Sequence, residues 1–175
     1  MILCDLPPGT TLFRAHAPVW ASRPTSGAGA AAKGGRFNRE GTQALYLSLD
    51  EMTALREYQQ TSSFLPPCTM CSYTVALRNL VDLRQLDASE AWDELWQDWR
   101  EDWRHLKFER HIEPPTWVLA DMVMDHGYTG ILFPSQTHEG GTNVVVYLDH
   151  LKGDNSIRVN DPDERLPRDQ ASWKR

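Results

Sequence analysis

Two glycines followed by an arginine, Gly34-Gly35-Arg36, form the first group of residues that could bind a charged ligand. Glycine lets backbone amides approach an anion closely, and an arginine can bind a phosphate through two parallel hydrogen bonds. The triplet lies in a long glycine-rich loop that we expect over residues 21–42. Loops of this length are uncommon in compact domains unless they are functional or disordered. The pattern is typical of phosphate binding, and a turn followed by a solvated arginine is the alternative.

A single carboxylate, Glu57, lies on one face of an expected helix that follows Tyr46. The other residues on this face at helical spacing are small or polar: Thr53, Ala54 and Thr61. A second face is apolar and contains Met52, Leu55 and Tyr58. A long acid among small residues can project into a cleft, which makes Glu57 a candidate catalytic residue; the alternative is a solvated helix face.

Three further polar residues lie in or beside apolar segments. Arg14 is inside the first expected strand, and Ser135 follows the apolar segment Gly130-Ile-Leu-Phe-Pro134. No Gly-x-Ser-x-Gly elbow surrounds Ser135, so we expect it to bind a ligand or cap a turn rather than act as a hydrolase nucleophile. Asn143 follows Gly140-Gly141, which predicts a flexible connection into the last strand.

Short apolar segments predict the strands and helices that position these residues. Strands are expected at 11–15, 43–47, 69–77, 131–133 and 144–148. One helix is expected after Ser48-Leu-Asp-Glu51, which has the spacing of a capping box. Another is expected over Thr116–His126, opened by Pro114-Pro115 and ended by Gly127. Strands separated by helices predict a mixed α+β fold: one domain over residues 1–175, with a small β-sheet core flanked by helices and a polar tail at 153–175.

Four tryptophans mark an amphipathic segment over residues 88–108. They are Trp92, Trp96, Trp99 and Trp103, spaced by four, three and four residues. This spacing gives one apolar stripe with acidic residues between its members. The stripe can be ordinary core, or it can be an exposed face for a partner subunit.

Composition excludes several classes of protein. The formal net charge is −6, which disfavours direct binding of nucleic-acid phosphates. No apolar run approaches the roughly 18 to 20 residues that span a membrane, and the first residues do not resemble a signal peptide. Three cysteines make a disulfide framework unlikely, so we expect a cytoplasmic protein. Cys68-x-x-Cys71 lacks a second pair and the histidines lack ligand spacing, so no metal site is expected. His138, near Ser135 in the chain, is expected to be solvated, and a place in the lining of the pocket is the alternative.

Taken together, these segments resemble the RES domain, a family named for its Arg, Glu and Ser. The resemblance covers residues from about 11 to 148 and runs through Leu12-Phe-Arg14, Gly34-Gly-Arg36-Phe-Asn38, Leu45-Tyr46-Leu-Ser48, Thr53-Ala-Leu-Arg-Glu57, Pro134-Ser135 and Asn143-Val-Val-Val-Tyr147. RES proteins are toxins of type II toxin–antitoxin systems that degrade NAD⁺ or transfer its ADP-ribose. Their fold is similar to that of bacterial ADP-ribosyltransferase toxins.

The resemblance implies roles for eight residues. Glu57, Arg36 and Tyr46 would be catalytic, and the residues implied to bind NAD⁺ are Arg14, Gly34, Gly35, Ser135 and Asn143. Arginines beside glycines suit the pyrophosphate, and a carboxylate can stabilise the cationic ribose that forms when the glycosidic bond breaks. Nicotinamide leaves as a neutral molecule, so no strong general acid is required and no metal is expected.

The resemblance leaves the acceptor of ADP-ribose open. Water or phosphate would deplete NAD⁺, whereas a protein side chain would make the chain a mono-ADP-ribosyltransferase. An RNA-cleaving toxin and a non-enzymatic binding module using the tryptophan stripe are the readings outside this class. The family also implies a partner, an Xre-like helix-turn-helix antitoxin whose C-terminal end blocks the active site. Any DNA binding would then belong to the antitoxin, and no membrane is implied.

Overall fold

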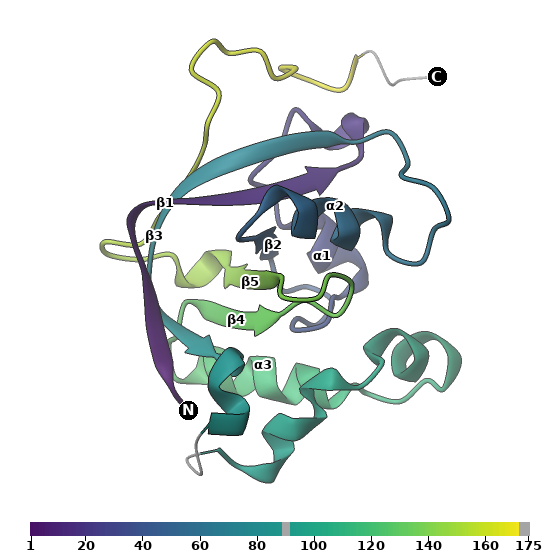
Figure 1. Ribbon diagram of the computed structural model, residues 1–175, viewed down its shortest axis with the longest axis vertical. Coiled ribbons are helices and arrows are strands. Elements are labelled where there is room, and N and C mark those ends of the chain that lie inside the picture. Colours follow the sequence, from purple (N-terminus) through teal and green to yellow (C-terminus); the bar gives the residue numbers. More distant parts are fainter. Residues whose placement is uncertain (89–91, 172–175) are drawn as a thin grey trace.

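A closed ring of paired strands organises the computed structural model, which describes residues 1–88 and 92–171. The strands are β1 Leu3–His16, β2 Ala44–Ser48, β3 Thr69–Asp82, β4 Gly130–Pro134, β5 Thr142–Tyr147 and β6 Ser156–Val159. Their order is β1-β2-β5-β4-β3-β6, and β1 also pairs with β3, so the first five strands close on themselves (Figure 1). The β3–β4 pair is parallel, and the other pairs are antiparallel.

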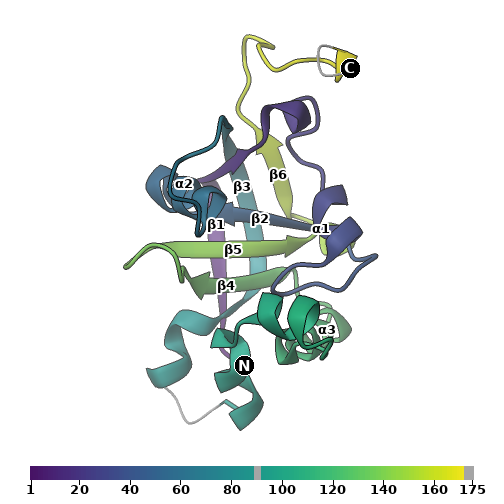
Figure 2. The same cartoon turned by 90° about the vertical axis from the view of Figure 1, so that its right-hand side faces the viewer.

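Helices lie around this ring. The α-helices are α1 Ala28–Lys33, α2 Glu51–Gln59 and α3 Pro115–Asp125. Short 3-10 helices span Pro18–Trp20, Leu83–Ala88, Glu94–Arg100 and Leu148–His150, and a π-helical turn spans His105–Glu109. Figures 1 and 2 show α2 beside β2 and α3 beside β4, on either side of the β2–β5–β4 strands. The expected mixed α+β fold is confirmed.

Alternation along the strands separates two hydrophobic cores. Side chains of successive strand residues point to opposite faces of a sheet. One face of the ring carries Leu12, Leu45, Leu47, Tyr73, Leu80, Leu132, Val144 and Val146. The other face packs against α3 and the tryptophan segment, in a core that contains Phe37, Trp96, Trp99, Leu119, Val123, Phe133 and Val145. Tyr46, Ser48 and Asn143 have the strand positions of this second face, where the candidate site forms.

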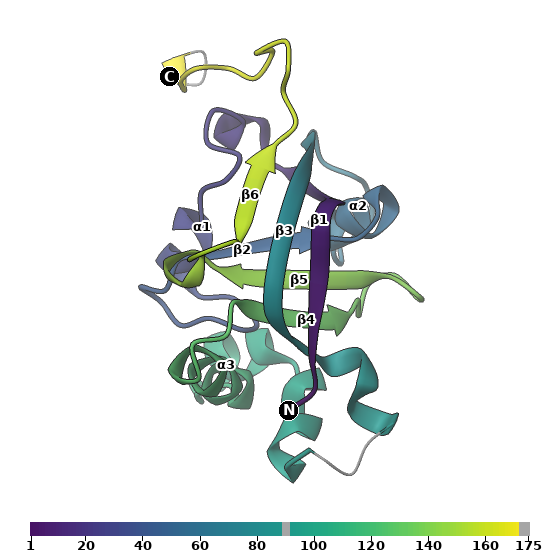
Figure 3. The ribbon, with the colours of Figure 1, turned by 90° about the vertical axis from the view of Figure 1, so that its left-hand side faces the viewer.

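Three strands differ from the sequence pattern, and one of them, β3, continues to Asp82 instead of ending at Leu77. β1 begins at Leu3 instead of Thr11, because its first half pairs with β3 from Leu3↔Val81 onward, across irregularities near Leu6. The polar tail also contains a strand, β6, which pairs with β3 through Tyr73↔Val159 (Figure 3). In β1 and β6, pairing with β3 forms strand that the residue pattern alone does not indicate.

Two local predictions are wrong in detail. The expected loop over 21–42 contains α1, whose sequence Ala-Gly-Ala-Ala-Ala-Lys is rich in the best helix former. The capping box at Ser48 does not form, because Ser48 is the last residue of β2 and its hydroxyl donates to Asn143. Asp50 caps α2 instead, accepting a hydrogen bond from the Thr53 amide at 2.8 Å.

The tryptophan stripe is core. Trp96 and Trp99 are 2% exposed and Trp103 is 6% exposed, while Trp92 packs against the same core at its margin. The beginning of the segment, residues 89–91, lies outside the described residues, as does the end of the predicted tail, 172–175. The helix predicted at Thr116–His126 is confirmed as α3, Pro115–Asp125. None of the helices in the described residues is long and apolar enough to span a bilayer.

Candidate functional site

Glu57 is the centre of a group of hydrogen-bonded side chains. Its Oε1 accepts a bond from Ser135 Oγ at 2.7 Å and another from Asn143 Nδ2 at 2.6 Å. These partners come from two different strands, since Ser135 follows β4 and Asn143 lies in β5. Because both protein donors use the same oxygen, the second oxygen of the carboxylate has no such donor in this group. The arrangement orients Glu57 and leaves Oε2 available to a ligand.

The register of three strands explains why these side chains meet. Ser48 pairs with Asn143 across β2 and β5, and Asn143 pairs with Phe133 across β5 and β4. Ser48 Oγ donates to Asn143 Oδ1 at 2.7 Å, which directs the Asn143 amide nitrogen toward Glu57. Ser48 and Asn143 are both buried, so each needs a partner, and they satisfy each other.

Ser135 has the hydrogen bonds of a structural serine. Its Oγ donates to Glu57 and accepts from the backbone amides of Thr137 at 3.2 Å and His138 at 3.1 Å. The hydroxyl proton is directed at the carboxylate and both amides stabilise the oxygen, which is the geometry of a serine turn. Of the two roles predicted for Ser135, ligand binding or capping a turn, these contacts form the turn cap.

The Gly-Gly-Arg triplet forms a tight turn against Tyr46. Gly35 N donates to Asn38 O at 3.0 Å, and Gly34 N donates to Ala30 O at 2.8 Å. Both glycine amides are therefore used within the protein. Gly34 has a φ of +73°, which suits glycine. A Cβ at Gly35 would lie 2.5 Å from the Tyr46 hydroxyl, so glycine is required there for packing.

Tyr46 holds the same turn through its hydroxyl. Its OH donates to Asn38 Oδ1 at 2.8 Å and accepts from the Phe37 amide at 2.9 Å. Burial raises the pKa of Tyr46 far above its ordinary value, so the phenol stays neutral. The residue as a whole is only partly buried. A neutral hydroxyl fixed from behind leaves the ring as the part that can touch a ligand.

Arg36 connects this turn to two other segments. Its Nη1 donates to the carbonyls of Trp99 at 2.8 Å and Glu101 at 2.9 Å, and its Nη2 donates to Gln136 Oε1. Burial lowers the pKa of Arg36 and repulsion from Arg104 lowers it further, while attraction to Glu57 opposes both. Arg36 thus links the tryptophan segment to the loop that carries Ser135.

Arg14 lies elsewhere. It pairs with Cys71, a member of the core on the opposite face of the strands from Asn143 and Tyr46. Its Nη1 donates to Pro24 O at 3.2 Å and Ser26 O at 3.3 Å, and burial lowers its pKa. Among the described residues, no hydrogen bond joins Arg14 to the group around Glu57.

His138 takes part in a second chain of hydrogen bonds beside Glu57. Its Nδ1 lies 2.7 Å from Thr53 Oγ1, and Thr53 Oγ1 donates to Asp50 Oδ2 at 2.6 Å. Thr53 and Glu57 are four residues apart in α2 and therefore share a helix face. Of the two alternatives for His138, full solvation is not what the structure shows, because the imidazole is partly buried against α2 beside Glu57.

The structure thus groups the predicted site residues unequally. Glu57, Ser135 and Asn143 are in direct contact. The Gly-Gly-Arg turn, which packs against Tyr46, is linked to them because Arg36 bonds Gln136, the residue that follows Ser135. Sequence reasoning gave no site role to three residues that complete these networks: Asn38, Ser48 and Gln136. Asn38 and Ser48 lie within the motifs quoted above and Gln136 adjoins Ser135 in the chain, so these positions were the available signals. No group of three or more His, Cys, Asp or Glu side chains in residues 1–88 and 92–171 is placed to hold a metal ion.

Comparisons with known proteins identify a family and a solved structure that are similar to this chain. The model of the RES domain family matches residues 11–169. A chain of the M. tuberculosis MbcT–MbcA toxin–antitoxin complex, known from its crystal structure, is similar with a TM-score of 0.60. The two chains are 19% identical, and the match covers 90% of this chain and 84% of that one. No curated protein matches the sequence. At this identity, the structural likeness shows a shared fold.

Proposed function

Because the chain belongs to the RES-domain family, we propose that it is the toxin of a toxin–antitoxin pair and that it consumes NAD⁺ by cleaving the nicotinamide–ribose bond. A chain with the same fold comes from a toxin–antitoxin complex, which supports the first part. The observation that carries the second part is the carboxylate of Glu57, oriented by Ser135 and Asn143 and left with one oxygen for a ligand.

The chemistry needs little from the protein beyond this carboxylate. When the glycosidic bond breaks, its electron pair goes to nicotinamide, which leaves as a neutral molecule. Positive charge develops on the ribose, and the Glu57 carboxylate stabilises it and accepts a bond from a ribose hydroxyl through Oε2. An acceptor then supplies an electron pair to the ribose carbon.

Arg36 and Tyr46 supply the binding surfaces in this proposal. The partly exposed ring of Tyr46 stacks on the nicotinamide or the ribose, because its hydroxyl is already used by the turn. Arg36 has guanidinium N–H groups beyond those that bind Trp99, Glu101 and Gln136, and its positive charge attracts the pyrophosphate. The glycines act by letting the turn pack closely, rather than by donating amides.

The test is release of nicotinamide from NAD⁺ by purified protein. Glu57→Gln keeps an oxygen for Ser135 and Asn143 but removes the charge, so we expect the rate to fall by about 100-fold or more. Glu139→Gln is the matched control, because Glu139 is exposed in the loop after β4. Equal rates for wild type and Glu57→Gln, or no nicotinamide from wild type at saturating NAD⁺, would overturn the proposal.

The same reaction mixtures identify the acceptor. Free ADP-ribose indicates hydrolysis, its 1″-phosphate in phosphate buffer indicates phosphorolysis, and label on one protein band from a lysate indicates transfer to a protein. We further propose that an Xre-like helix-turn-helix antitoxin blocks the site with its C-terminal end. A carboxylate-bearing segment suits a site that contains Arg36, with Arg104 near enough to lower the Arg36 pKa.

A further inference from the structure

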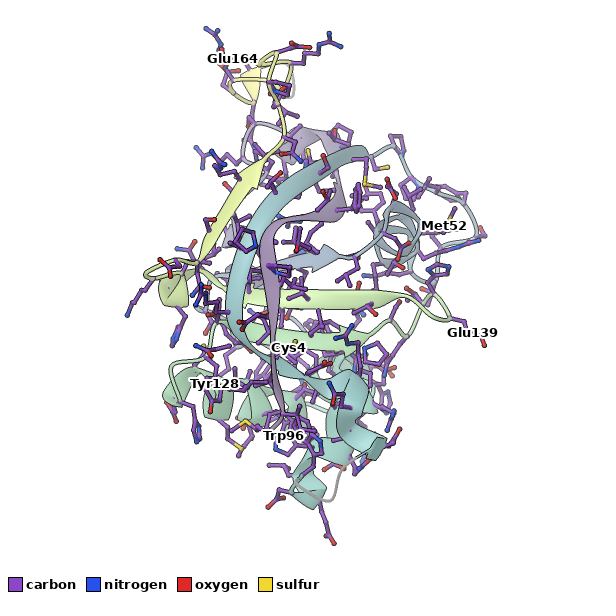
Figure 4. All side chains as sticks on the ribbon, turned by 60° about the vertical axis from the view of Figure 1, so that its left-hand side comes forward. Cys4, Met52, Trp96, Tyr128, Glu139 and Glu164 are labelled. Carbon is purple, nitrogen blue, oxygen red and sulfur yellow. The ribbon has the colours of Figure 1, made fainter. Side chains whose placement is uncertain are left out.

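The loop between β4 and β5, residues 135–141, is attached to α2 at its centre by His138. Figure 4 shows Met52 on α2 and Glu139 in this loop on the same edge of the molecule. Within the loop, Ser135 N donates to Gly141 O at 2.8 Å and Gly141 N donates to His138 O at 3.0 Å. These bonds close the loop on itself, and the 2.7 Å contact between His138 Nδ1 and Thr53 Oγ1 fastens it to the helix.

The number of available protons determines which group donates in the contact between His138 and Thr53. A threonine hydroxyl has one proton, and Thr53 gives it to Asp50 Oδ2 at 2.6 Å. Burial raises the pKa of Asp50, but bonds from the Thr53 hydroxyl and amide outweigh it and hold the pKa below its ordinary value. An ionised carboxylate cannot donate, so the proton between Thr53 and His138 must come from His138. The imidazole therefore donates from Nδ1.

We propose that His138 is a positioning residue for the reaction proposed above: by donating from Nδ1 to Thr53 it fastens the 135–141 loop to α2 and so holds Ser135 against Glu57. The same loop supplies the His138 amide to Ser135 Oγ at 3.1 Å. Thr53 lies one helical turn before Glu57, so the loop is tied to α2 at two points, Thr53 through His138 and Glu57 through Ser135. Loss of the His138–Thr53 contact allows the Ser135–Glu57 contact to move.

Gly141 provides a second way to disturb the tie. A Cβ at this position would overlap the Thr53 hydroxyl and lie 3.0 Å from His138 Nδ1. The backbone at Gly141 has no positive φ, so alanine is conformationally acceptable and its effect comes from this contact alone. Gly140-Gly141 was predicted to be flexible. At Gly141, glycine is also required for packing, because the His138–Thr53 contact occupies the space that a Cβ would need.

The experiment compares two amides in place of the imidazole. The side-chain nitrogen of His138→Asn takes the place of Nδ1, whereas that of His138→Gln lies about one bond farther out, at the place of Nε2. We expect His138→Asn to remain within about 3-fold of wild type. We expect His138→Gln, Thr53→Val and Gly141→Ala each to lower kcat for NAD⁺ by about 10-fold with KM changed less than about 3-fold, because they misplace the reacting groups without removing one. Thr53→Ser and Glu139→Gln are controls.

Hydrogen exchange of the 135–141 amides gives a readout that does not depend on NAD⁺. It should accelerate by about 10-fold in His138→Gln and Thr53→Val, and in neither His138→Asn nor Glu139→Gln. Loop exchange and kcat in His138→Gln equal to wild type would overturn the positioning role. If exchange responds as expected while wild type releases no nicotinamide, the tie stands and the proposed function fails.

Discussion

Tyr46 has two parts that the structure places in different surroundings. Its hydroxyl bonds Asn38 and the Phe37 amide in the Gly-Gly-Arg turn, while the residue as a whole is only partly buried. Phenylalanine would keep the ring and lose only the bonds. The contributions of the two parts can therefore be separated by a single substitution.

We expect Tyr46→Phe to destabilise the protein more than it weakens NAD⁺ binding. The Phe37 amide and Asn38 Oδ1 lose a partner, which costs about 1–3 kcal/mol. Urea unfolding measures that loss, and KM for NAD⁺ should rise less than about 3-fold because the stacking ring remains. Tyr58→Phe is the control, since the Tyr58 hydroxyl bonds Pro67 O in an exposed contact. A large rise in KM with unchanged stability would instead give the hydroxyl a direct role with the ligand.

Among the single elements, helix α2 begins at an N-cap residue, Asp50, that also contacts the site. Asp50 accepts from the Thr53 amide through Oδ1 and from the Thr53 hydroxyl through Oδ2, so one carboxylate both begins the helix and fixes the hydroxyl that receives His138. The first turn thereby joins helix stability to the geometry of the site. Glu57 follows one turn after Thr53 in the same helix.

The pH dependence of stability tests this cap. The pKa of Asp50 lies below its ordinary value of 3.8 in the folded protein, so its contribution is complete above pH 3.8 and is lost as the pH falls through the folded pKa. Asp50→Ala should lower the unfolding free energy by about 1 kcal/mol at pH 7. We expect the difference from wild type, measured by urea unfolding, to shrink in strongly acidic buffer. A difference that stays constant from pH 7 to below the folded pKa would show that the charge of Asp50 contributes nothing.

Element by element, the sequence predicts contacts that depend on local pattern and misses those that depend on distant backbone. Glu57 and Ser135 were singled out because a lone acid among small residues and a serine after a buried strand are visible locally, and they meet. The bonds from Arg36 to the carbonyls of Trp99 and Glu101 were not predictable, because every residue type has a backbone carbonyl and the sequence does not distinguish these two. Ser48 has the spacing of a cap, but a distant strand claims its hydroxyl through Asn143.

In the molecule as a whole, the closed ring of strands places Arg36 and Arg14 on opposite faces. Arg36 lies on the face that carries Glu57, where its bonds join the tryptophan segment to the Ser135 loop. Arg14 belongs to the opposite face, where its bonds to Pro24 O and Ser26 O hold the segment after β1, and Tyr73 donates to the same Pro24 carbonyl at 2.8 Å. Family resemblance implies a catalytic role for Arg36 and NAD⁺ binding for Arg14, but the ring gives the two residues different surroundings.

Arg14→Met decides between these roles because it keeps a long apolar stem and removes every donor. Two carbonyls lose a charged partner, so we expect a loss of about 1–3 kcal/mol and a fall in Tm of several degrees, at about 2–4 °C per kcal/mol for a chain of this size. Nicotinamide release, assayed well below the new Tm, should stay within about 3-fold of wild type. Glu57→Gln should show the opposite pattern, an unchanged Tm with a much lower rate. If Arg14→Met instead raises KM for NAD⁺ strongly at full stability, the segment after β1 must rearrange when NAD⁺ binds and bring Arg14 to the ligand.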